Sequence, residues 1–201
     1  MVAQMLDFTG EHGLRDIADR LLERRRVEYI HEGALTFVAT PGIPHTVIVS
    51  ALVDSFAVAK HDGLTSIKWF VASENIQWEF RDGSRRFSIP DLTIAYPGFT
   101  DRWSLQDNTT LLAGITSPGC DTVRDDLELK PRRYAKGGVP LYLLVDQEKG
   151  EWTLHKLIEG RPRYGVHSSG VYGDPIALPE PFGFSISTDA WPPFEPEPRE
   201  R

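Results

Sequence analysis

Cysteine is nearly absent from this sequence of 201 residues, in which Cys120 is the single thiol. One cysteine cannot form an internal disulfide framework, and it cannot supply a multi-cysteine zinc site. The sequence also lacks an obvious apolar run that would span a bilayer. The N-terminus lacks the basic flank and long apolar core of a signal peptide. We therefore expect a cytoplasmic protein with no membrane partner.

A surplus of positive charge is missing as well. The 22 Lys and Arg residues are outnumbered by 29 Asp and Glu residues, which leaves a formal net charge of −7. Binding to nucleic acid through bulk electrostatics needs Lys and Arg near the phosphates. The charge balance is therefore unfavourable to a protein that binds DNA over its whole surface. It still allows a nuclease whose basic residues are concentrated around one cleft.

The remaining composition is that of an ordinary globular domain, with 40% hydrophobic and 25% charged residues. A chain of this length can bury one substantial core. We expect a single domain over residues 1–187. The segment 188–201 is rich in proline and glutamate, and we expect it to be disordered because so many prolines prevent a regular ladder or helix.

Hydrophobic periodicity predicts helices that alternate with strands. Apolar residues at helical spacing predict an N-terminal helix over 14–26 and a second helix over 45–60. A β-hairpin is expected between them, over 27–39. Further strands are expected at 66–72, 76–81, 89–96, 110–118, 139–146 and 151–157, with short edge strands at 164–167 and 175–178. This order predicts an α/β domain with a mixed central β-sheet flanked by helices.

Two of the central strands carry candidate site residues. Asp91 follows Pro90 at the mouth of a strand, where its carboxylate could bind Mg²⁺ or simply cap a turn. A metal-dependent phosphodiesterase would place a second carboxylate near position 114 and a polar or cationic group at position 116. The residues there are Gly114 and Thr116. Glycine offers no metal-binding side chain, and inside a strand it often marks a close approach of another group.

The charged segment that follows predicts a helix with a functional face. Asp126, Lys130 and Tyr134 are spaced by four residues and share one face if the helix is continuous. Pro131 would either kink that helix or begin a second one. Lys130 could orient a water or hold a phosphate; the alternative is an Asp–Lys pair on a solvated face. The basic residues that could follow a DNA backbone are Lys130, Arg132, Arg133 and Lys136.

Together these segments resemble the Uma-type restriction endonuclease family, a branch of the PD-(D/E)XK nucleases that is frequent in actinobacteria and cyanobacteria. The matching segments are 27–35, 44–45, 90–91, 115–118, 138–146 and 178–183, together with Asp126, Lys130 and Tyr134. The resemblance implies a restriction-endonuclease-like PD-(D/E)XK core, often assembled as a homodimer. It also implies Mg²⁺-dependent cleavage of DNA phosphodiesters, with Asp91 as the metal ligand.

The resemblance places a glycine where the family has its second catalytic acid. That acid maps onto Gly114, and the usual lysine maps onto Thr116, so that Lys130 would act in its place. A substitute acid would have to come from Asp54, Glu74, Glu79 or Asp126.

Three hypotheses follow. The chain is a divergent nuclease that uses Mg²⁺, or it is an inactive member without a metal that binds DNA or a protein partner. In the third hypothesis it is an enzyme for a small molecule. Gly114 would then open a space lined by His45, Asp91, Cys120 and Tyr134.

Overall fold

The computed structural model describes residues 27–30, 34–37, 42–64, 70–72, 76–79, 85–88, 90–96, 109–116 and 125–193. Its centre is a six-stranded sheet in the order β10-β9-β8-β7-β6-β3. The strands are β3 (Phe70–Ala72), β6 (Leu92–Ala95), β7 (Thr109–Ile115), β8 (Leu141–Asp146), β9 (Glu151–Leu157) and β10 (Tyr164–Val171). Strands β7 and β8 run parallel, whereas the other neighbours pair antiparallel. The expected mixed sheet is therefore confirmed.

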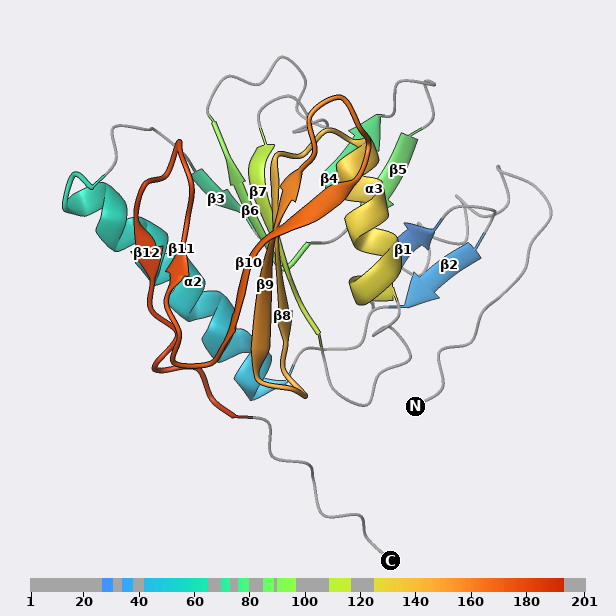
Figure 1. The fold of residues 1–201 in the computed structure, drawn as a ribbon. Helices are drawn as coiled ribbons and strands as arrows, with labels where there is room; N and C mark the ends of the chain where they lie inside the picture. The colour runs from blue at the N-terminus through green and yellow to red at the C-terminus, as the bar shows by residue number, and fades with distance from the viewer. Residues whose placement is uncertain are drawn as a thin grey trace, which may run out of the picture.

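Helices cover both faces of this sheet (Figure 1). Helix α2 (Ile43–His61) lies on one face, together with the short hairpin of β11 (Ile176–Ala177) and β12 (Ser185–Ile186). Helix α3 (Lys130–Lys136) lies on the other face, directly after the π-helical turn η1 (Asp125–Leu129). In sequence, α3 lies between β7 and β8. Because these two strands are parallel, the chain needs a crossover connection between them, and α3 is part of it.

The described residues also form two antiparallel hairpins outside this sheet, one before β3 and one between β3 and β6. One pairs β1 (Val27–Ile30) with β2 (Ala34–Phe37), and the other pairs β4 (Ile76–Glu79) with β5 (Arg85–Ser88). The first is the hairpin expected from the sequence. The expected N-terminal helix over 14–26 lies outside the described residues.

Among the described residues, the sheet divides the core into two clusters. The larger cluster lies on the α2 face and combines Ile48, Leu52 and Phe56 with inward residues of β6 to β9 and of the C-terminal segment. The smaller cluster lies on the α3 face and consists of Leu112, Tyr134, Val139 and Tyr142. Every residue of β7 is buried, because this strand has a layer on each side. Alternate residues of β7 therefore belong to different clusters.

Helix α2 begins after Gly42 with a proline in its first turn, and it ends with Lys60 and His61, whose positive charge suits the negative end of the helix dipole. By length and composition alone, this helix could cross a membrane, which differs from the expectation drawn from the sequence. Its inner face is nevertheless part of the core, with Ile48, Leu52 and Phe56 fully buried. A buried core helix passes the same test of length and composition.

The C-terminal boundary also differs from the expectation. Trp191 is 4% exposed, belongs to the larger core cluster and contacts Tyr172 edge to face, with ring centroids 5.2 Å apart. Thr188 is buried, and its hydroxyl donates to the carbonyl of Asp174 at 2.9 Å. The ordered chain thus continues through residues 188–193, because prolines prevent a ladder but do not prevent packing. Residues 194–201 lie outside the described residues.

Candidate functional site

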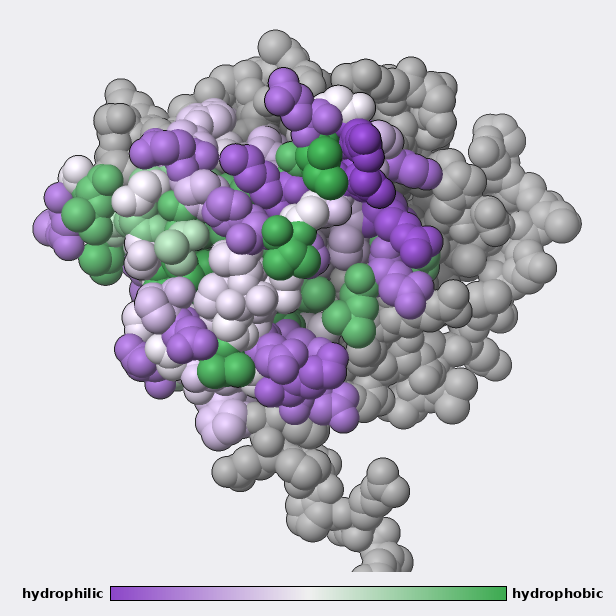
Figure 2. Space-filling model, in the orientation of Figure 1, coloured by the Kyte–Doolittle hydropathy of each residue, from purple (hydrophilic) through white to green (hydrophobic). Residues whose placement is uncertain are grey.

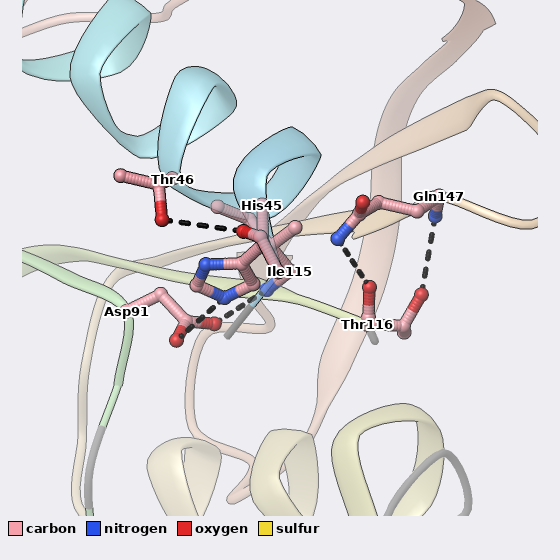
Figure 3. Close-up of polar contacts among 7 residues, drawn as sticks. His45, Thr46, Asp91, Ile115, Thr116 and Gln147 are labelled. Carbon is pink, nitrogen blue, oxygen red and sulfur yellow. Dashed lines mark hydrogen bonds and ion pairs between the residues drawn. The ribbon is translucent and has the colours of Figure 1, made fainter. Parts of the chain in front are cut away.

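Asp91 lies directly before β6, and three polar contacts fix it there, of which Figure 3 shows the two made by its carboxylate. Its amide donates to the carbonyl of Ala113 at 3.0 Å, and its Oδ2 accepts the amide N–H of Ile115 at 2.7 Å. Its Oδ1 lies 3.0 Å from Nε2 of His45. Both carboxylate oxygens are therefore engaged, one with the backbone of β7 and one with a side chain from α2.

His45 comes from the first turn of α2, and the helix brings it to the end of the sheet where β6 begins and β7 ends. The side chains of His45 and Asp91 are only 8% and 15% exposed. In this geometry a proton on Nε2 of His45 is donated to the carboxylate. The structure thus brings together two of the residues that the third hypothesis placed around one space.

Position 114 is filled rather than open. A Cβ atom built on Gly114 would overlap the hydroxyl oxygen of Tyr142 and would lie 3.3 Å from its Cζ. Cβ atoms in proteins essentially never come within 3.0 Å of another heavy atom, and the hydroxyl oxygen lies inside that limit. The third hypothesis expected Gly114 to open a space for a small molecule, and that expectation is wrong because the hydroxyl end of Tyr142 takes the space.

Thr116 joins the ends of two strands. Its Oγ1 accepts the amide of Gln147 at 3.1 Å, and its carbonyl accepts Nε2 of Gln147 at 2.7 Å (Figure 3). Its own amide donates to the carbonyl of Val145 at 2.9 Å. Thr116 is 1% exposed. Its hydrogen bonds therefore connect the ends of β7 and β8 inside the protein, away from solvent.

The two candidates on α3 are both buried. Lys130 is 7% exposed and Tyr134 is 1% exposed. The expectation of a solvated face at Lys130 is therefore wrong, because this residue is shielded from solvent. Arg132 and Lys136 are exposed, whereas Arg133 is only partly buried. Pro131 lies in the first turn of α3, which matches the reading that it begins a helix.

An aromatic cluster that the sequence did not indicate surrounds Tyr142. The ring of Tyr142 stacks on His155 and Tyr164, with centroids 6.0 Å and 6.1 Å apart, and lies 5.3 Å from the ring of Tyr134. Burial lowers the pKa of His155. Burial, with a smaller contribution from nearby Tyr134, raises the pKa of Tyr164. In the sequence, only Gly114 inside the strand pointed to this cluster. A glycine there indicates that another group approaches the backbone closely, but it does not identify that group as Tyr142.

No metal centre forms among the side chains that the structure describes. Within that part of the chain, no three His, Cys, Asp or Glu residues are grouped closely enough to hold an ion. Asp54, one of the possible substitute acids, is exposed on α2. It lies nine residues after His45, or about 13 Å along the helix axis, and so does not join Asp91. Cys120 and Glu74 lie outside the described residues, as do the side chains of Glu79 and Asp126.

Comparison with solved structures defines the class of fold. The chain is similar to a crystal structure described as a "putative nuclease belonging to DUF820" from Anabaena variabilis, with a TM-score of 0.57. The two sequences are 17% identical, and the match covers 85% of this chain and 94% of that chain. At this identity the likeness establishes the fold alone.

The family follows from the sequence match. Residues 16–189 match the Uma2 family, described as "Putative restriction endonuclease". The chain therefore belongs to the Uma2 family, and the resemblance noted from its sequence is confirmed. A comparison with curated proteins finds no match.

Proposed function

We propose that this protein has a PD-(D/E)XK nuclease core that has lost the Mg²⁺-dependent hydrolysis of DNA. The order of elements supports such a core. Asp91 enters β6, β7 lies antiparallel beside it, α3 follows, and β8 returns parallel to β7. Helix α2 precedes these elements and covers one face of the sheet.

The observation that carries the proposal is the state of the Asp91 carboxylate. Mg²⁺ requires nearly octahedral coordination by oxygen atoms and is usually held by one or two carboxylates with water and substrate oxygens. Here one oxygen of Asp91 contacts His45, the other accepts a backbone N–H, and position 114 offers no side-chain oxygen. A metal would have to compete with both contacts, without help from a second acid at the family's position.

DNA is the partner that the family suggests, and the exposed residues Arg132 and Lys136 of α3 are the cations that could contact its phosphates. Hydrophilic residues gather over α3 in the face shown in Figure 2. Lys130 contributes less to such a surface because it is buried. A binding module is favoured over a small-molecule enzyme, since Tyr142 fills the expected space at Gly114. The homodimer, the cytoplasmic location and the single domain stay predictions.

The test combines metal binding with cleavage. Wild type is titrated with Mg²⁺ and with Mn²⁺ by calorimetry, and plasmid DNA is incubated with the protein and each metal. We expect no saturable binding and no metal-dependent nicking. The matched control is Asp62→Asn, which removes an exposed carboxylate that is also paired with a histidine, at 2.9 Å. Saturable binding and cleavage that survive Asp62→Asn but are lost in Asp91→Asn would refute the proposal.

A further inference from the structure

We propose that Gly114 and Tyr142 form an exclusive pair: the hydroxyl end of Tyr142 occupies the space that any side chain at position 114 would need. An acid at position 114 therefore requires a smaller residue at position 142. The significance of an acid at position 114 rests on the proposed function, whereas the packing of the two residues does not depend on it.

The register of the two strands brings these residues together. Strands β7 and β8 are parallel, and Leu112 pairs with Tyr142 while Gly114 pairs with Leu144. Tyr142 and Gly114 are thus diagonal neighbours, two positions apart on the same face of the sheet. Long aromatic side chains reach across such a diagonal. The hydroxyl end of Tyr142 consequently lies over Gly114.

Space, and not backbone conformation, is what requires glycine here. Gly114 does not have the positive φ angle that favours glycine elsewhere in the chain, for example at Gly138 with φ of 82°. Any residue could adopt its extended backbone. The overlap with Tyr142 is therefore the feature that excludes a side chain.

Tyr142 cannot easily move aside. It is completely buried, and its ring is enclosed by Tyr134, His155 and Tyr164 at the centroid distances given above. Tyr164 is itself held by its hydroxyl, which donates to the carbonyl of Val139 at 2.9 Å. Close-packed aromatic rings resist displacement because a shift of one ring forces its neighbours out of their rotamers. Tyr142 therefore fills the space beside the Cα atom of residue 114.

The pairing is tested by a double-mutant cycle on stability. Wild type, Gly114→Ala, Tyr142→Phe and the double variant are compared by thermal and urea unfolding. Gly165→Ala is the matched control, because Gly165 also lies in a strand and a Cβ there would meet Ile158 at an ordinary 3.5 Å. We expect Gly114→Ala to lower the melting temperature by roughly 5 °C, a shift typical of overpacking in a domain of this size. Gly165→Ala should change it little.

In the Tyr142→Phe background, which lacks the overlapping hydroxyl, the added cost of Gly114→Ala should shrink by at least about half. If Gly114→Ala alone fails to fold, recovery of folding in the double variant supports the pair, and failure of the double variant as well overturns it. The pair is also overturned if Gly114→Ala is as stable as Gly165→Ala, or if its cost is unchanged in the Tyr142→Phe background. None of these readings depends on nuclease activity, so the test is separate from the metal titration.

Discussion

Replacing Asp91 by alanine should damage folding, whatever its effect on chemistry. Asp91 connects three elements. It directly precedes β6, and its carboxylate accepts the N–H of Ile115 in β7 and contacts His45 of α2. Alanine leaves the Ile115 amide and the His45 ring without their acceptor in a site that is largely shielded from water. Each buried polar group left without a partner costs about 1–3 kcal/mol, so the two groups together cost about 2–6 kcal/mol.

We therefore expect Asp91→Ala to lower the free energy of unfolding by about 2–6 kcal/mol. For a domain of this size that corresponds to a loss of roughly 10 °C in melting temperature. Asp91→Asn retains one carbonyl oxygen that can accept the Ile115 N–H, so its loss should be about half as large. His45→Ala removes only one of the two contacts and should also cost less than Asp91→Ala.

The assay is urea unfolding followed by circular dichroism, with linear extrapolation to water. The control is Asp62→Ala, because the pair of His61 and Asp62 has a similar distance of 2.9 Å but side chains that are 88% and 51% exposed. Exposed pairs contribute about 0–1 kcal/mol. A loss below about 1 kcal/mol for Asp91→Ala, equal to the loss for Asp62→Ala, would refute the structural role inferred for Asp91.

Three further outcomes are expected. Because burial lowers the pKa of His155, the unfolded chain takes up a proton first, so stability should fall as the pH drops below 6.5; His155→Phe should flatten this slope in urea midpoints measured against pH. Burial raises the pKa of Tyr172 to about 12 from 10.0, so stability should fall between these pH values as the unfolded state loses its proton, and Tyr172→Phe should remove part of that fall. Trp191→Ala should cost about 3–5 kcal/mol in the same unfolding assay, and a chain ending at residue 187 should be destabilised, whereas one ending at residue 193 should match wild type.

Local patterns in the sequence predicted the elements well, because period and turn chemistry are local properties. The stripe of apolar residues in α2 and the continuous apolar run of β8 both appear in the structure. Contacts between residues that are distant in the sequence could not be predicted in this way. Asp91 and His45 are separated by more than 40 residues in the sequence, and only the packing of α2 on the sheet brings them within 3.0 Å.

Gly114 shows where sequence reasoning reached its limit. The absence of a carboxylate at this position was visible in the sequence, but its consequence depended on which residue of β8 lies diagonally across from it. That register is a property of the assembled sheet. Lys130 is similar: helical spacing placed it on a face with Tyr134, yet spacing cannot say whether that face contacts solvent or the sheet.

The two departures from a nuclease site involve different neighbours, and this limits how the site could be rebuilt. The carboxylate of Asp91 contacts His45 of α2 and the backbone N–H of Ile115. A side chain at position 114 would meet the hydroxyl of Tyr142 in the cluster on the α3 face. An acid at position 114 combined with a smaller residue at position 142 would still face a carboxylate that is bonded elsewhere. Metal binding in such a variant should therefore improve further when His45→Ala releases one oxygen of Asp91, and calorimetry on the two variants measures that gain directly.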